Sequence, residues 1–276
     1  MKLPKNFPID ETKLVSLDTL LKKKSIPLIP LSSGADSFNN ILGGGFKKGC
    51  VYVFFGENRT GKTQLCHQMC IQAFKHHQLT TSHEKKNSNE ITLYYDTENT
   101  FRSERIEELA GLNNLHYRNV LNSILVSKIM SNDTLLMAIN LAKQKITSHP
   151  IKLLIVDSIN NYYRSEKGDP SLSFSHTKNI FLRILEEILE LTVKHDLISL
   201  LTAQITPNFI KNETIKELPV GLHYLDHYFS EFFYLSHKKD NGNKNLCYIH
   251  LVNSHQNLEK KLLYEVTSHG IVDYKF

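Results

Sequence analysis

The eight residues from Gly56 to Thr63, Gly-Glu-Asn-Arg-Thr-Gly-Lys-Thr, have the types and spacing of a phosphate-binding loop, G-x-x-x-x-G-K-S/T. They follow the apolar run Val51–Phe55 and precede a helical pattern that begins at Lys62. In such a loop the backbone N–H groups and the helix N-terminus hold phosphates, the lysine reaches the β and γ oxygens, and the threonine ligates magnesium. The alternative is a glycine-rich turn with an incidental lysine. The motif predicts a site for ATP and Mg²⁺ built from Gly56, Glu57, Asn58, Arg59, Thr60, Gly61, Lys62, Thr63 and Gln64.

Two carboxylates follow other apolar runs that are expected to be buried strands. Asp157 follows Leu153-Leu154-Ile155-Val156, and Glu98 closes the run Leu93–Glu98. A phosphate loop needs a carboxylate at the end of a second strand to hold magnesium through water, which Asp157 supplies. Taken in isolation, an aspartate after an apolar strand is as readily a helix cap as a metal ligand. Glu98 has the position to polarise a water that attacks the γ-phosphate.

The elements that would position these residues alternate along the chain. Runs rich in β-branched or aromatic residues predict strands, and helical patterns fall between them, which is the signature of a mostly parallel sheet with helices on both faces. The expected strands are Val51–Phe55, Ile91–Asp96, Ile124–Val126, Ile151–Asp157 and Leu197–Gln204. The expected helices are Lys62–His77, Ser103–Leu109, Asp133–Ser148 and Ser173–His195.

The pattern changes after Gln204. Short strands at Glu231–Ser236, Leu246–Val252 and Leu262–Val266, with a turn at Asp240–Asn243, predict an antiparallel extension of the same sheet. The polar segment Thr80–Glu90 predicts a loop. We expect residues 1–30 to form an N-terminal arm and residues 31–276 to form one α/β domain.

Composition sets wider limits. The 276 residues are 41% hydrophobic and 22% charged, and no apolar run is long enough to span a bilayer, so we expect no membrane partner. The first residues lack the pattern of a secretory signal, which predicts a cytoplasmic protein. The net charge of +5 favours polyanionic partners. Cys66 and Cys70 lie one helical turn apart, and we expect buried thiols there in preference to metal ligands.

The run Tyr95-Asp96-Thr97-Glu98-Asn99-Thr100-Phe101-Arg102-Ser103-Glu104-Arg105 resembles the segment after the second core strand of the RecA/RadA recombinases. The phosphate loop with Arg59, its continuation Thr63–His67, and Leu154–Ser158 followed by Tyr163-Arg164 resemble the archaeal and eukaryotic branch. The resemblance extends from about Leu31 to the C-terminus. It implies a RecA-like ATPase core that binds DNA and takes part in recombination and repair, in the cytoplasm or associated with the nucleoid or nucleus.

The resemblance implies further roles. Glu98 would be the catalytic base, and Gln204 would sense the γ-phosphate and relay its presence to the DNA-binding loop. The two loops that face DNA in this family correspond to Arg164–Phe174 and Thr206–Gly221. Their candidate DNA contacts are Arg164, Lys167, Phe209, Lys211 and Lys216.

The chain departs from the family pattern in several places. Asn99 and Ala203 stand where the family usually has glycine and asparagine. The position of the family's subunit-docking motif reads Val15-Ser16-Leu17-Asp18, so an aspartate would have to enter an apolar pocket. The segment Asn253–Leu258 lacks the aspartate and proline that cap a neighbour's ATP. These losses resemble recombinase paralogues such as archaeal RadB.

The leading hypothesis is therefore an accessory ATPase with slow DNA-dependent turnover that assists a RadA-type recombinase or a related paralogue. Three alternatives remain open. The first is a recombinase that forms filaments through another docking surface. The second is a nucleotide-gated interaction module without catalysis, which docks through its N-terminal arm. The third is a RecA-fold kinase or clock-type ATPase, which the Asp96–Arg105 run disfavours.

Overall fold

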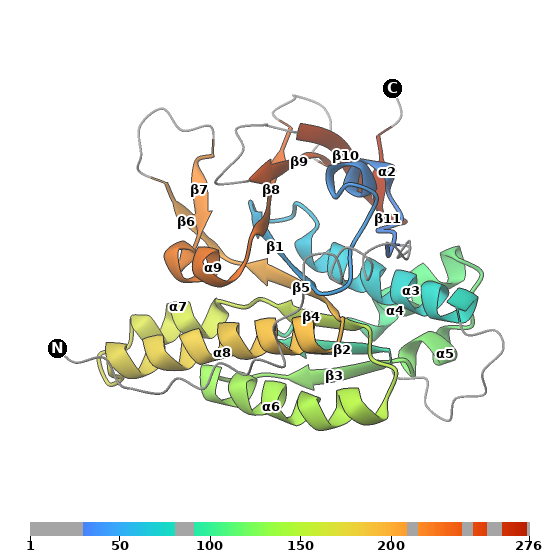
Figure 1. The fold of residues 1–276 in the computed structure, drawn as a ribbon. Helices are drawn as coiled ribbons and strands as arrows, with labels where there is room; N and C mark the ends of the chain where they lie inside the picture. The colour runs from blue at the N-terminus through green and yellow to red at the C-terminus, as the bar shows by residue number, and fades with distance from the viewer. Residues whose placement is uncertain (1–29, 81–90, 209–214, 239–244, 253–260, 275–276) are drawn as a thin grey trace, which may run out of the picture.

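The computed structural model describes residues 30–80, 91–208, 215–238, 245–252 and 261–274 (Figure 1). The predicted turn at Asp240–Asn243, most of the predicted loop at Thr80–Glu90 and nearly all of the N-terminal arm lie outside these ranges. Leu31 forms a backbone bridge with Phe46, so the folded core includes the first residue of the predicted domain. None of the helices in the described ranges is long and apolar enough to cross a membrane.

A nine-stranded sheet forms the centre of the molecule, with the order β11-β10-β9-β8-β1-β5-β4-β2-β3 (Figure 1). β8, β1, β5, β4, β2 and β3 are parallel, whereas β9, β10 and β11 are antiparallel. This arrangement confirms the predicted mostly parallel sheet. The strands are β1 (Cys50–Gly56), β2 (Thr92–Asp96), β3 (Ile124–Lys128), β4 (Leu153–Asp157), β5 (Ile198–Ala203), β8 (Glu231–His237), β9 (Leu246–Val252), β10 (Lys261–Thr267) and β11 (Gly270–Asp273).

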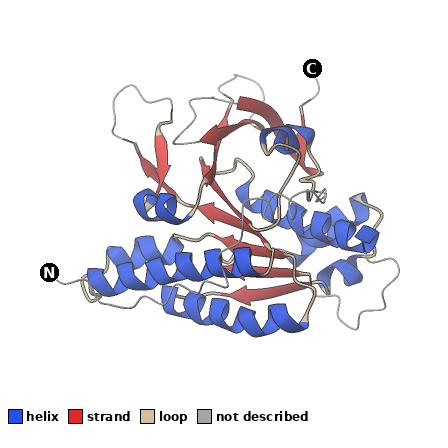
Figure 2. Cartoon of the chain, in the orientation of Figure 1, coloured by secondary structure: helices blue, strands red, loops and turns tan. Residues whose placement is uncertain are grey.

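Helices cover both faces of the sheet (Figure 2). Successive side chains of a strand point to opposite faces, so β1 supplies Tyr52 and Phe54 to one core and Val51, Val53 and Phe55 to the other. The first core packs against α2 (Asp36–Ile41), α3 (Lys62–Thr80), α4 (Ser103–Leu112) and α5 (Tyr117–Leu121). The second packs against α6 (Asn132–Ser148), α7 (Asn161–Lys167), α8 (Phe174–Lys194) and α9 (Leu222–Tyr228).

The predicted C-terminal extension is confirmed, with one refinement. Its first strand, β8, pairs antiparallel with β9 but parallel with β1, so the antiparallel part begins at β9. The sequence patterns missed β11, the four short helices α2, α5, α7 and α9, and a small hairpin. The hairpin strands are β6 (Ile205–Pro207) and β7 (Glu217–Pro219), which pair with each other. The predicted DNA loop at Thr206–Gly221 therefore has a paired base.

One predicted loop begins as a helix. Arg164 and Lys167 lie on α7 and not on the expected loop at Arg164–Phe174, and Phe174 opens α8. The helical hydrogen bond from the N–H of Arg164 to the carbonyl oxygen of Asn160 begins that turn. Tyr163 is buried against Phe181 of α8, with the ring centroids 4.3 Å apart, and this packing holds the short helix in place. A seven-residue helix is too short for its periodicity to be recognised in the sequence.

Candidate functional site

The phosphate loop connects the end of β1 to the start of α3, and two of its glycines are required by backbone geometry. Gly56 has φ 135° and Gly61 has φ 96°, a region that side chains rarely adopt. A Cβ at Gly56 would overlap the backbone carbonyl of Leu235 in β8. The hydroxyl of Tyr264 donates to the carbonyl oxygen of Thr60 at 2.6 Å. The path of the loop is therefore fixed by the neighbouring strands as well as by its own residues.

Lys62 is the first residue of α3, and its ammonium group folds back over the loop. Its Nζ donates to the carbonyl oxygens of Gly56 at 2.8 Å and Glu57 at 2.9 Å. Burial lowers the pKa of Lys62, and the nearby carboxylates of Asp157 and Glu98 oppose that change. A phosphate at this place would offer the ammonium anionic acceptors instead of neutral carbonyl oxygens, which makes a stronger hydrogen bond.

Asp157 ends β4 and is 3% exposed. Its carboxylate accepts hydrogen bonds from the hydroxyls of Thr202, Tyr94 (3.1 Å) and Thr100 (3.4 Å). Burial raises the pKa of Asp157, and the hydrogen bonds from Thr202 and Thr63 act in the other direction. The charged form is therefore costly without a cation beside it.

The segment that carries Glu98 is held in place by a neighbouring carboxylate. Asp96 ends β2, and its side chain accepts the backbone N–H groups of Glu98 (3.2 Å), Thr100 (3.1 Å) and Phe101 (3.0 Å). Asn99 has φ 58°, and asparagine tolerates this conformation better than most residues with a side chain. The tight turn therefore explains why a glycine in the family pattern can be replaced by asparagine here.

His67 connects α3 to the Glu98 segment. Its Nδ1 lies 2.9 Å from the carbonyl oxygen of Thr63, and its Nε2 accepts the backbone N–H of Arg102 at 3.1 Å. Its ring packs against Tyr94 and Phe101, with centroids at 6.0 and 5.3 Å. Burial lowers the pKa of His67 to about 4. The ring is therefore neutral at pH 7, with its proton on Nδ1.

Glu98 and Gln204 meet at the edge of the same site. The Oε1 atom of Glu98 accepts from the hydroxyl of Ser158 at 2.5 Å and from Nε2 of Gln204 at 3.0 Å. Arg164 reaches from α7 and donates from Nη1 to Oε1 of Gln204 at 3.3 Å. Arg164, which the resemblance assigned to DNA, thus bonds a residue of the nucleotide site.

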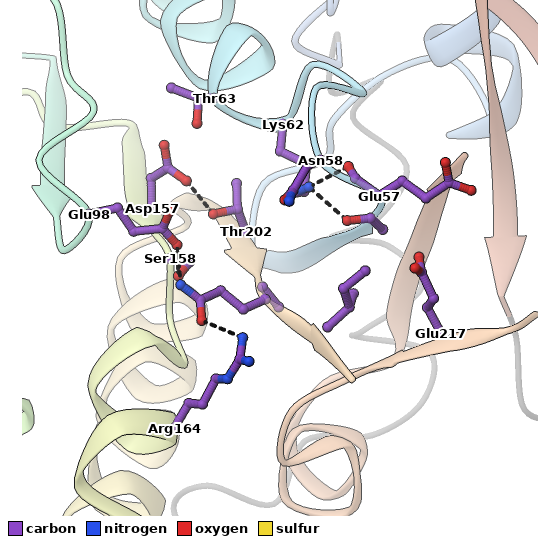
Figure 3. Close-up of a pocket in the computed structure, with 14 residues that line it drawn as sticks. Glu57, Asn58, Lys62, Thr63, Glu98, Asp157, Ser158, Arg164, Thr202 and Glu217 are labelled. Carbon is purple, nitrogen blue, oxygen red and sulfur yellow. Dashed lines mark hydrogen bonds between the residues drawn. The ribbon is translucent and has the colours of Figure 1, made fainter. Parts of the chain in front are cut away.

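One cavity of about 410 Å³ connects these groups (Figure 3). In Figure 3, Lys62, Asn58 and Glu57 line it on the side of the phosphate loop, and Glu98, Asp157 and Ser158 face them. The lining includes the carboxylates of Glu57, Glu98, Asp157 and Glu217 but the cations of only Lys62 and Arg164. This excess of acid disfavours a bare triphosphate and suits one that carries a divalent cation.

The oxygen donors around the cavity fit magnesium. Mg²⁺ prefers hydroxyl, carboxylate and water oxygens, and the side chains of Thr63 and Asp157 both line the cavity. Of the other residues predicted from the motif, Gly56, Glu57 and Asn58 also line it, whereas Arg59, Thr60, Gly61 and Gln64 do not. The side chain of Gln64 instead accepts from Nε of Arg105 at 2.7 Å.

The candidate DNA contacts are dispersed. Lys167 is exposed at the end of α7, and Phe209 and Lys211 lie outside the described residues. Lys216 borders a second cavity of about 520 Å³, between β7 and the outer strands. Other side chains that line it are Glu57, Glu217, Tyr234, Ser236, His237, Lys238, Tyr248, His250 and Lys261.

Sequence reasoning missed several residues of the site. Thr202 lies inside a uniformly buried strand, and Tyr94 points from β2 to Asp157, so neither has a local signal. Ser158 was visible as the residue after Asp157, but its contact with Glu98 depends on the alignment of two strands. Glu217 enters the cavity from the small hairpin.

A phosphate loop between a central strand and its helix, with carboxylates at the ends of two neighbouring parallel strands, defines the P-loop class of α/β proteins with a RecA-like core. Residues 23–274 of the chain match the family model described as Rad51. The chain therefore belongs to the Rad51 family of RecA/RadA recombinases, whose members are ATP-binding proteins of recombination and repair. The resemblance inferred from the motifs is confirmed.

Proposed function

We propose that the chain binds Mg·ATP in the cavity of about 410 Å³ and hydrolyses it slowly. The observation that carries this proposal is the convergence of Lys62, Thr63, Asp157, Glu98 and Gln204, which come from four separate segments. Lys62 would hold the β and γ oxygens, and Glu98 would accept a proton from the attacking water. Thr63 and Asp157 would hold the magnesium, which supplies charge neutralisation when bound.

The hydrogen bonds of Glu98 support slow turnover. Its Oε1 atom already accepts two hydrogen bonds, from Ser158 and Gln204, so either Oε2 takes the proton from water or one of these bonds must first be exchanged. A general base acts best with an unoccupied lone pair aimed at the water. We infer that Gln204 governs the availability of Glu98.

The nucleotide proposal is tested with Lys62→Ala. Loss of a charge-assisted hydrogen bond of about 1.5–3 kcal/mol should weaken binding of an ATP analogue about 10- to 100-fold by isothermal titration. Lys75→Ala is the matched control, because Lys75 lies on the same helix and bonds Asn113 instead. If the two variants bind the ATP analogue with equal affinity, Lys62 does not contribute to the nucleotide site.

For DNA, we propose that the second cavity contributes to binding a single strand. Three lysines and two histidines line it, and Nζ of Lys261 lies 3.9 Å from the ring centroid of Tyr248. Cations beside an aromatic face are suited to phosphates and stacked bases. Glu57 and Glu217 border both cavities, so a strand bound in the second cavity would lie close to the nucleotide.

This site is tested by measuring the affinity for a fluorescent oligothymidylate over a range of salt concentrations. The double variant Lys216→Ala/Lys261→Ala should bind several-fold more weakly, and its salt slope should be lower by about 1 for each phosphate that a lysine no longer neutralises. Lys143→Ala/Lys194→Ala removes the same charge from α6 and α8. If both double variants weaken binding equally, only net charge matters and the cavity is not the site.

We also propose that a related recombinase docks at the edge of β3. β3 is the last strand in the described sheet, and exposed apolar side chains lie on this strand, directly after it, and on α6, the next helix in the chain. These are Val126 (44% exposed), Met130 (65%), Met137 (64%) and Leu141 (61%). An extended apolar segment can pair with such a strand and fill the adjacent surface with alternate side chains.

The docking proposal is tested with a purified recombinase of the same family and organism, with and without ATP. Met137→Glu/Leu141→Glu should lower its capture at least tenfold, whereas Leu112→Glu, on α4, should leave it unchanged. If the double variant still captures the recombinase, the edge of β3 is not the docking site.

An accessory role follows from the sequence at the two places where the family makes filament contacts. Asp18 and the segment Asn253–Leu258 disfavour self-assembly, and both lie outside the described residues. Electron microscopy of the protein alone, with ATP and single-stranded DNA, separates the two roles. Helical filaments would favour the autonomous recombinase.

A further inference from the structure

A row of three side chains crosses the antiparallel extension beside the phosphate loop. His237 ends β8, Cys247 lies opposite it on β9, and Tyr264 lies opposite Cys247 on β10. Residues that are directly opposite on neighbouring strands point to the same face of a sheet. The row therefore places an imidazole, a thiol and a phenol side by side, and the thiol and the phenol belong to residues that are 0% exposed.

Both ends of this row bond the main chain of the phosphate loop. Nε2 of His237 lies 2.8 Å from the carbonyl oxygen of Asn58, and the hydroxyl of Tyr264 donates to the carbonyl oxygen of Thr60 at 2.6 Å. A carbonyl oxygen only accepts hydrogen bonds, so Nε2 of His237 carries a proton. The antiparallel extension thus holds two carbonyl groups of the loop.

Cys247 selects the tautomer of His237 that makes this bond. Its Sγ lies 3.6 Å from Nδ1 of His237. Burial raises the pKa of Cys247 to about 11, so the side chain is a thiol at pH 7 and has one S–H to donate. In the neutral imidazole with its proton on Nε2, Nδ1 is an acceptor for that S–H. The thiol therefore stabilises the tautomer that donates to Asn58.

The two held carbonyl groups fix the direction of two N–H groups. A peptide group is planar and trans, so its N–H points away from its carbonyl oxygen. The carbonyl of Asn58 shares its peptide group with the N–H of Arg59, and the carbonyl of Thr60 shares its peptide group with the N–H of Gly61. Because both carbonyls are bonded to the extension, both N–H groups point away from it and are available to an anion.

The loop needs this support because its backbone is strained at Arg59. The φ of Arg59 is 64°, in the left-handed region that is costly for a residue with a side chain. The ammonium of Lys62 also bonds carbonyl oxygens of the loop, but it would exchange these bonds for a phosphate. Neither His237 nor Tyr264 is among the side chains that line the cavity of about 410 Å³, so a bound nucleotide leaves their bonds in place.

We propose that His237 and Tyr264 are positioning residues of the nucleotide site, and that Cys247 acts on this site through His237. They hold two peptide groups of the phosphate loop with the N–H of Arg59 and the N–H of Gly61 directed to the phosphates, without contacting the nucleotide themselves. This inference rests on the proposed function, because the direction of these N–H groups matters only when a phosphate is bound.

Tyr264→Phe tests the end of the row on β10, because it removes the hydroxyl and keeps the buried ring. Isothermal titration of the full chain with Mg²⁺ and a non-hydrolysable ATP analogue should show about 3- to 10-fold weaker binding. Tyr95→Phe is the matched control, since the hydroxyl of Tyr95 donates to the carbonyl oxygen of Ala138 at 2.8 Å and the residue is 4% exposed. Both variants lose one buried hydrogen bond, so both melting temperatures should fall by about 2–4 °C. Only Tyr264→Phe should lose affinity.

Two substitutions of His237 separate its hydrogen bond from its packing. His237→Gln keeps an N–H donor near the place of Nε2 and should keep the affinity for the analogue within about twofold. His237→Leu keeps the bulk without the donor and should weaken binding about 3- to 10-fold. The loop holds the substrate and the transition state alike, so the KM for ATP should rise in His237→Leu while kcat stays unchanged. These variants decide the question if Tyr264→Phe does not fold.

The outcomes separate the two proposals. If the unsubstituted protein does not bind the analogue, the proposed function fails and this inference fails with it. If the protein binds the analogue, but Tyr264→Phe binds it as tightly as Tyr95→Phe does and His237→Leu as tightly as His237→Gln, nucleotide binding stands. The positioning role of His237 and Tyr264 is then refuted.

Discussion

Asp157→Asn should have opposite effects on stability and on ligand binding. The carboxylate of Asp157 is buried, and burial raises its pKa above the ordinary value of 3.8. The folded protein therefore binds this proton more tightly than the unfolded chain does. The contribution of Asp157 to stability is greatest below pH 3.8 and falls as the pH rises through the raised pKa, so the full cost of the charged carboxylate is present at neutral pH.

The neutral amide removes this cost at pH 7. Thr202 donates to one oxygen of the carboxylate and Tyr94 to the other. The amide oxygen can accept from one of these hydroxyls, and the other hydroxyl can rotate to accept from the NH₂ group. Removal of this desolvation cost should stabilise the protein by about 1–2 kcal/mol, which lies within the range that single stabilising substitutions commonly reach. For a chain of this size the melting temperature should rise by about 2–6 °C.

Binding should change in the other direction. Removal of a group that supports a bound metal typically lowers affinity about 10- to 100-fold. Asp157→Asn should therefore weaken binding of Mg²⁺ with an ATP analogue by that factor and reduce the thermal shift that this ligand produces. Thermal unfolding with and without ligand, together with isothermal titration, measures both effects on the same samples.

Asp96→Asn is the matched control, because Asp96 pairs in register with Asp157 on the adjacent strand. The carboxylate of Asp96 accepts hydrogen bonds from three backbone N–H groups. The asparagine side chain has only one acceptor oxygen, so this substitution should destabilise the protein by about 1–3 kcal/mol. The argument is refuted if Asp157→Asn unfolds at a lower temperature than the unsubstituted protein, or if it retains the full ligand-induced shift.

Two further predictions concern groups that connect the site to its scaffold. Burial lowers the pKa of His67 from 6.5 to about 4, so the unfolded chain binds a proton at this imidazole more readily than the folded protein does. The free energy of unfolding should therefore fall by about 3 kcal/mol as the pH drops from 6.5 to 4. Denaturant titrations across that range should show a flatter profile for His67→Gln, and an unchanged profile would contradict the assignment. Gly56→Ala should lose more than about 2 kcal/mol and bind no nucleotide, because its Cβ meets the Leu235 backbone, whereas Gly111→Ala, on open helix surface, should gain about 0.5–1 kcal/mol. Similar melting temperatures for the two alanine variants would refute the steric argument.

The sequence was sufficient for the elements that have long or regular patterns. The strand before the phosphate loop, the helix at Lys62 and the amphipathic helix α8 were predicted within a few residues, because buried faces impose a period on the sequence. The four short helices lacked enough turns to show such a period. α7 was the consequential omission, since it carries Arg164 and Asn161 into contact with Gln204.

Local spacing by itself determined the phosphate loop, since the residues that wrap a phosphate are consecutive in the chain. It also marked Asp157 and Glu98 as carboxylates that follow buried strands. The tertiary structure decided what surrounds them: the strand order places β1, β5, β4 and β2 side by side, which brings Thr202 to Asp157 and Gln204 to Glu98. These contacts join residues 45 and 106 positions apart in the chain, and no local pattern encodes a hydrogen bond between strands whose order is set by the packing of the whole sheet.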